Sequence, residues 1–280
     1  MTIHLGVEPQ TVQTGAYGVL TESAEFESSL MLIRPNLWLL AANIDLVGAE
    51  TELVNVVGRE IILREAMHGS QDKFDFCLID CAPSLGLLSL NALAAAQEAL
   101  IPLQPHFLAL QGFGKLLQTV DLVNKRINPS LRVSGVLLCM YDTRASLPNE
   151  VRADIEQFLA GARGSQTAWS EAEILPTFIR RNIKLAEAPS YGQTIFEYDP
   201  SCNGAEDYGR VADFFLGIDG RAQEEPRQAE PKAQTRVAPV PVEIRSVNLP
   251  APRCYTPVPI WTEPVLDKAP PQDDLAADRP

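Results

Sequence analysis

Asp80 is the residue whose type and position most directly suggest chemistry. It follows the four apolar or near-apolar residues Phe76–Ile79 and precedes a Cys-Ala-Pro-Ser turn. A carboxylate at the end of a buried strand suits a water-mediated contact with Mg²⁺ beside a nucleotide phosphate, because Mg²⁺ prefers oxygen ligands and retains much of its hydration shell. A capping role at a strand-to-loop turn is the plainer interpretation. The type and position of Asp80 alone do not distinguish the Mg²⁺ contact from the capping role.

Cysteine is the other residue type that could support chemistry. The five cysteines have irregular spacing, and their odd number does not suggest a secreted disulfide framework. Cys77 and Cys81 would lie on one face of the same strand, about 13 Å apart. We therefore expect buried small side chains here and no shared metal.

The elements that would position Asp80 alternate between apolar runs and helical periods. Strands are expected at 37–42, 74–80, 99–104, 133–140 and 172–179, and helices at 49–67, 85–97, 110–127, 150–159 and 205–216. This alternation predicts an α/β fold with a mostly parallel sheet and helices on both faces. Ligands of such sheets bind beyond the carboxyl ends of the strands, which here include Asp80, Gln104 and 140–142.

Composition divides the chain into two parts. Residues 1–218 have the periodic apolar content of one domain, whereas residues 219–280 hold twelve of the 22 prolines and predict an acidic, disordered tail. The net charge of −13 does not suggest a general polyanion binder. No apolar run is long enough for a transmembrane helix, and we expect a cytoplasmic protein, with association with the nucleoid left open.

Several longer segments carry a family resemblance. Residues 74–93, FDFCLIDCAPSLGLLSLNAL, resemble the Walker B and switch segment of the ParA/Soj partitioning ATPases, which are deviant Walker P-loop NTPases. Further segments match in the same order along the chain: NIDLVGAE at 43–50, QGF at 111–113, GVLLCMYD at 135–142, RNIKLAEAPS at 181–190, YDP at 198–200 and GAE at 204–206. The similarity extends from about Thr2 to Leu216.

The resemblance implies a nucleotide site. Asp80 would lie beside the Mg²⁺ of bound ATP, with water between them. Pro83 would belong to the switch turn that senses the γ-phosphate and shapes the dimer interface. Met140, Tyr141 and Asn182 would surround the adenine base.

The resemblance also implies a DNA-binding patch formed by Arg180, Arg181 and Lys184, which would contact phosphates without reading sequence. A solvated loop face is the alternative. The family usually has proline at the position of Arg180, and it often has basic residues where this chain has 201–203. We therefore expect weak nonspecific DNA binding.

One expected motif is absent from these 280 residues. The family's phosphate-binding loop contains Gly-Lys-Thr, but neither Gly-Lys-Thr nor Gly-Lys-Ser occurs here. The sequence 112–115, Gly-Phe-Gly-Lys, is interpreted as a helix start. The fold is expected to lack its first, central strand, so that two strand edges would be exposed. Either the natural chain starts upstream, which we favour, or a partner fills the gap.

The sequence thus predicts a ParA-family partitioning protein that binds ATP and Mg²⁺, dimerises and works with a ParB-type partner. No catalytic residue is identified, and whether the chain hydrolyses ATP stays open. The alternative is a non-enzymatic module that pairs with a full-length homologue. A MinD-like membrane ATPase is disfavoured, because prolines interrupt the C-terminal region where an amphipathic helix would be needed. Residues 250–261 could dock a partner, although a spacer is the preferred interpretation.

Overall fold

A computed structural model describes residues 1–82 and 86–218. The predicted tail, including 250–261, lies outside the described residues. Three strands, β3 (Glu98–Leu103), β4 (Arg132–Tyr141) and β5 (Ile174–Arg180), form a parallel sheet in the order β3-β4-β5. The predicted α/β class is confirmed, since helices alternate with these strands along the chain.

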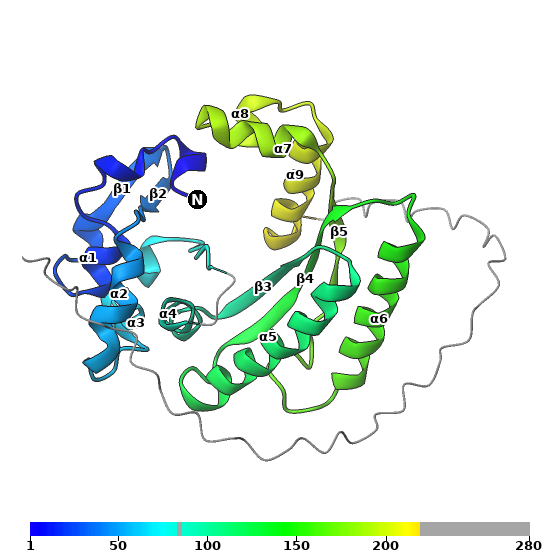
Figure 1. Cartoon of the computed structure of the whole chain (residues 1–280), viewed down its shortest axis with the longest axis horizontal. Helices are drawn as coiled ribbons and strands as arrows, with labels where there is room; N and C mark the ends of the chain where they lie inside the picture. The colour runs from blue at the N-terminus through cyan, green and yellow to red at the C-terminus, as the bar shows by residue number, and fades with distance from the viewer. Residues whose placement is uncertain (83–85, 219–280) are drawn as a thin grey trace, which may run out of the picture. The chain divides into compact units, whose positions relative to one another are not determined.

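Both faces of the sheet are covered by helices (Figure 1). On one face, Val136 and Leu138 of β4 pack with α5 (Phe107–Arg126) and α6 (Ser146–Ala162) in the main core. On the other face, the alternate residue Leu137 packs with α9 (Asn203–Phe215). This alternation follows from the period of two along a strand, and it explains why β4 is continuously apolar from Val136 to Tyr141.

The N-terminal part contains an antiparallel hairpin of β1 (Leu30–Arg34) and β2 (Leu37–Leu40). The sequence predicts a buried strand near β2, but Trp38 is 47% exposed and its cross-strand neighbour Leu32 is 59% exposed. The strand was correctly predicted, and its burial holds for Leu39, which is 4% exposed, but not for the face that carries Trp38 and Leu32. In the described residues this sheet has only two strands, so no third strand or facing layer covers these side chains.

The predicted helix at 49–67 is interrupted in the structure. It consists of α2 (Leu46–Glu52), a short 3₁₀ turn (Leu53–Asn55) and α3 (Ile62–Ala66), with Gly58 between them at a φ of 75°. These pieces pack with α1 (Ala16–Leu20) and α4 (Leu87–Ala95) around a second apolar cluster. The predicted apolar stripe is retained only in part: Leu53 and Ile62 are buried in this cluster, whereas Val57 is 99% exposed.

The strand predicted at 74–80 does not form. Within the described part of the chain, residues 74–82 make no backbone–backbone hydrogen bonds, and no strand pairs with them. Phe76 is 57% exposed and Leu78 is 81% exposed. An apolar run becomes a strand only when a neighbour supplies ladder hydrogen bonds, and the described sheet provides none at this position.

Short elements connect β5 to α9. These are α7 (Ile183–Glu187), a 3₁₀ turn (Ala188–Tyr191) and α8 (Ile195–Tyr198). Helix α8 begins with a capping box between Thr194 and Glu197. Among the described residues, no helix combines the length and the apolar character needed to cross a bilayer.

Candidate functional site

The candidate site lies at the carboxyl ends of β4 and β5. These strands are parallel, and Tyr141 pairs in register with Arg180. Met140 therefore sits one residue before this pair on β4, and Asn182 sits two residues after it on the β5 side. Two of the residues predicted to surround adenine are thus brought to one edge of the sheet, where ligands of parallel sheets bind.

Met140 has an unusual backbone conformation. Its φ is 54°, in the left-handed region that costs a residue with a side chain about 1–3 kcal/mol. The side chain is 59% exposed at the sheet edge. Because strained residues cluster at binding sites, this observation supports a ligand-facing role for Met140.

Tyr141 lies beneath this edge. It is buried, its ring centroid lies 4.7 Å from that of Phe178, and its hydroxyl donates to Asn149 Oδ1 over 2.5 Å. Burial raises the pKa of Tyr141. Tyr141 supports the strand end from the core, and its predicted place around the adenine base stays a prediction.

Asn182 caps the start of α7. Its side-chain Oδ1 accepts a hydrogen bond of 2.8 Å from the Lys184 backbone N–H. In the described part of the chain, the side-chain Nδ2 group has no hydrogen-bond partner. Asn182 is therefore held in place by its oxygen, and its nitrogen can donate to a ligand.

Asp80 is in the predicted segment but not at the end of a strand. Its carboxylate is 59% exposed, and Oδ2 lies 3.0 Å from the amino group of Met1. No group of three or more potential metal ligands occurs within residues 1–82 and 86–218. A single carboxylate fits a water-mediated contact with Mg²⁺, whose other ligands would be phosphate and water. Pro83 lies outside the described residues.

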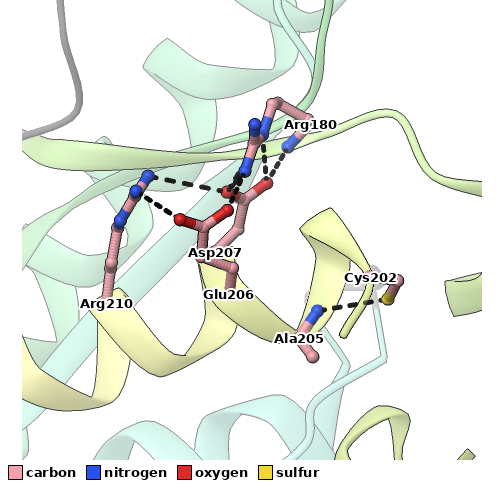
Figure 2. Close-up of polar contacts among 6 residues, drawn as sticks. All are labelled: Arg180, Cys202, Ala205, Glu206, Asp207 and Arg210. Atoms are coloured by element: carbon pink, nitrogen blue, oxygen red, sulfur yellow. Dashed lines mark hydrogen bonds and ion pairs between the residues drawn. The ribbon is translucent and has the colours of Figure 1, made fainter. Parts of the chain in front are cut away.

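Arg180 is engaged within the protein (Figure 2). Its backbone N–H donates to Asp207 Oδ2 over 2.8 Å, and its guanidinium donates to both Asp207 oxygens over 2.6–3.1 Å. A further bond of 2.9 Å reaches Glu206, which also pairs with Arg210. Hydrogen bonding to Asp207 raises the pKa of Arg180. Arg180 therefore has partners within the protein, and its contact with DNA phosphates stays a prediction.

The remaining predicted DNA contacts differ from each other. Lys184 pairs with Glu187 at 3.0 Å and lies 5.6 Å from the centroid of the Tyr198 ring, and the bond to Glu187 raises the pKa of Lys184. Arg181 is exposed and has no ion pair among the described residues. The three cations therefore do not form a free patch.

Asp207 was missed by the sequence analysis, although its side chain is 0% exposed. A signal was available in the helical period, because Asp207 lies four residues before the buried Val211 on the face that packs against the sheet. A carboxylate at such a position requires a cationic or hydrogen-bonding partner. The sequence does not show which of the many arginines provides it.

Comparisons with known proteins agree with this arrangement. The family model described as an AAA domain matches residues 1–133. The chromosome-partitioning ATPase Soj of Treponema pallidum is 42% identical over 186 residues, which are 66% of this chain and 69% of that protein. The sporulation initiation inhibitor protein Soj of Bacillus subtilis is 38% identical over 208 residues, covering 74% and 78% of the two chains.

A solved structure shows a similar fold with higher coverage. Cobyrinic acid a,c-diamide synthase from Mycobacterium smegmatis, with bound ADP and magnesium, has a TM-score of 0.62 and 31% identity over 80% of each chain. The sequence motifs, the parallel sheet and the two Soj relatives agree. The chain belongs to the ParA/Soj family of chromosome-partitioning P-loop ATPases.

Proposed function

We propose that this chain is a partition protein that binds an adenine nucleotide with Mg²⁺ at the carboxyl edge of its sheet. The observation that carries this proposal is the juxtaposition of Met140 and Asn182 at the ends of two paired parallel strands. Magnesium and ADP are bound by the similar cobyrinic acid a,c-diamide synthase. Asp80 is the residue that would hold Mg²⁺ through water.

Each residue at this edge would have a separate role. Met140 offers an exposed apolar thioether for one face of the base, and Tyr141 supports it from the core. Asn182 donates from its free Nδ2 group, since its oxygen caps α7. When bound, Mg²⁺ would neutralise phosphate charge. We derive no hydrolytic step, because these 280 residues contain neither Gly-Lys-Thr nor Gly-Lys-Ser.

Nucleotide binding can be tested by titrating the purified chain with Mg-ATP and Mg-ADP in a calorimeter. Replacement of Asn182 by Ala removes a donor to the base and should weaken affinity about tenfold. Asn55→Ala, at an exposed position on a 3₁₀ turn, is the matched control and should bind as the wild type does. Wild-type protein that binds neither nucleotide, or equal affinities for all three proteins, would refute the proposed site.

We further propose a cytoplasmic role with a ParB-type partner, dimerisation and weak nonspecific DNA binding. Arg181 carries the DNA contact, assisted by Lys184. In an electrophoretic or anisotropy assay at low salt, Arg181→Ala should weaken DNA binding severalfold and reduce its salt dependence. Arg144→Ala, at another exposed arginine, is the control. An unchanged affinity for Arg181→Ala would exclude this contact.

A second candidate function is supported by the segment 74–80, which pairs with no strand among residues 1–82 and 86–218. Its backbone groups and the side chains of Phe76 and Leu78 are available to another strand, as in recognition by strand addition. We propose that a homologous chain supplies this strand, so that the protein acts as an interaction module whose sheet is completed by pairing.

Mass photometry and hydrogen exchange test this second candidate together. Mixing the chain with a Soj-type homologue should give a heterodimer and protect the amides of 74–80. Leu78→Asp should abolish the pairing, because a charge would enter the shared layer. Leu122→Asp, at an exposed position on α5, should leave it intact. A monomeric chain whose 74–80 amides stay unprotected with the homologue would contradict this function.

A further inference from the structure

A carboxylate from α2 lies at the beginning of α4. Glu50 Oε1 accepts a hydrogen bond of 3.3 Å from the backbone N–H of Leu88, in the first turn of α4. The first N–H groups of a helix have no partner within the helix, and a negative charge at this end is favourable. The cap residue, Gly86, has no side chain to supply the bond. Glu50 therefore performs from another helix the role that a capping side chain usually performs locally.

Gly86 leaves the space that this carboxylate occupies. A Cβ atom at position 86 would lie 2.2 Å from Glu50 Oε1 and 3.1 Å from its Cδ, too close for both to stay in place. The φ of Gly86 is −80°, which any residue can adopt. Glycine thus allows Glu50 to approach the start of α4, and a residue with a Cβ atom here would displace the Glu50 carboxylate, which ends a flexible side chain.

The contact between α2 and α4 is rigidly supported. Ala49, next to Glu50, is fully buried in the same apolar cluster that includes Leu87 and Leu88. Asn91, 1% exposed on α4, donates to the backbone oxygen of Arg59 over 2.7 Å and accepts from the Leu63 N–H over 3.1 Å. Both ends of the Glu50 contact are therefore held by packing.

Helix α4 is also linked to the segment that carries Asp80. The Ser89 hydroxyl donates to the backbone oxygen of Ala82 over 3.4 Å. Ala82 lies two residues after Asp80, so the first turn of α4 contacts Glu50 on one side and this segment on the other. We propose that Glu50 is a positioning residue that sets the start of α4, and through it the placement of the segment carrying Asp80, with Gly86 providing the necessary space.

Hydrogen exchange of the full chain tests the contact without any ligand. Glu50→Ala should lower the protection of the 87–89 amides about tenfold, the effect of losing a helix cap. Glu50→Gln retains an acceptor and should restore most of the protection. Gly86→Ala should cause a similar loss by displacing Glu50. Glu52→Ala is the control, because Glu52 lies on the same helix but accepts from Tyr17.

The double variant gives the decisive comparison. If Glu50 and Gly86 act through one contact, the double variant Glu50→Ala/Gly86→Ala should lose less amide protection at 87–89 than the two single variants predict. Its fold-decrease should be clearly smaller than the product of the two single fold-decreases. A fold-decrease in the double variant that equals the product of the two single fold-decreases would overturn the proposal. Unchanged protection of the 87–89 amides in Glu50→Ala would overturn it as well.

A second measurement connects the contact to the nucleotide, and this link rests on the proposed function. Affinity for Mg-ATP should fall severalfold in Glu50→Ala, recover in Glu50→Gln and stay unchanged in Glu52→Ala. Loss of 87–89 protection with unchanged Mg-ATP affinity would refute the positioning of Asp80. Wild-type protein that binds no nucleotide would refute the proposed function, whereas the exchange data would still decide the Glu50 contact.

Discussion

Replacement of Arg180 by Met should destabilise the fold by leaving Asp207 buried without its main partner. The Asp207 carboxylate is 0% exposed, and Arg180 provides it with hydrogen bonds from the backbone and the guanidinium. After the substitution the backbone N–H bond of 2.8 Å can persist, and Arg210 lies 4.0 Å from the Asp207 carboxylate. Methionine preserves much of the aliphatic volume, so the change mainly removes charge and donors.

The magnitude follows from the cost of removing one partner from a buried charge. Removing one partner of a buried ion pair costs about 3–5 kcal/mol. The Arg180 side chain is 32% exposed, so water can reach part of the vacated site, and we expect about 2–3 kcal/mol. For a domain of this size, each kcal/mol shifts the melting temperature by about 2–4 °C, which predicts a decrease of roughly 4–12 °C.

Urea unfolding followed by circular dichroism, with calorimetry as a second assay, measures this change. The double variant Arg180→Met/Asp207→Leu provides the matched comparison. It removes both charges and should recover much of the lost stability, because apolar replacement of a buried pair is often nearly neutral. A free energy of unfolding for Arg180→Met within 0.5 kcal/mol of wild type, as for an ordinary surface substitution, would refute the reasoning. A double variant less stable than Arg180→Met would also contradict it.

Three further predictions concern separate parts of the fold. The hydrogen bonds from Arg34 lower the pKa of Glu197 to about 2. Their contribution to the free energy of unfolding is therefore fully present at pH values above the usual pKa of a carboxyl group, and it is lost as the pH falls toward 2. Wild-type and Glu197→Gln stabilities, measured by urea unfolding, should therefore differ at pH 7 and converge near pH 2; a constant difference would exclude this linkage. Gly135→Ala should lower the free energy of unfolding by about 1–3 kcal/mol in the same assay, because its Cβ would lie 2.9 Å from the backbone oxygen of Glu173, just before β5. A free energy of unfolding equal to that of the wild type would contradict this packing. Burial raises the pKa of Cys139 to about 11, and burial and Asp80 also raise the pKa of Cys81. Because Cys81 is exposed, the native protein should alkylate there well before Cys139, as mass spectrometry of iodoacetamide-treated protein can show; equal rates would argue against this difference in access.

The local sequence predicted the elements that fold around their own apolar pattern. β4 was expected at 133–140 and occurs at Arg132–Tyr141, and α9 was expected at 205–216 and occurs at Asn203–Phe215. The order of these elements correctly indicated a parallel sheet with helices on both faces. The quoted motifs also identified the family, because those segments keep their residue types and their order along the chain.

Contacts between distant residues were not predictable in the same way. The segment 74–80 has the composition of a strand, yet no described strand pairs with it, because strand formation depends on hydrogen bonds from another part of a sheet. Arg180 looked like a free cation in the sequence, but Asp207, 27 residues later, binds it inside the fold. Periodicity therefore predicted the helices and strands whose apolar side chains pack in the core, such as β4 and α9. Only the tertiary structure decided which charges find partners and whether the 74–80 backbone joins a sheet.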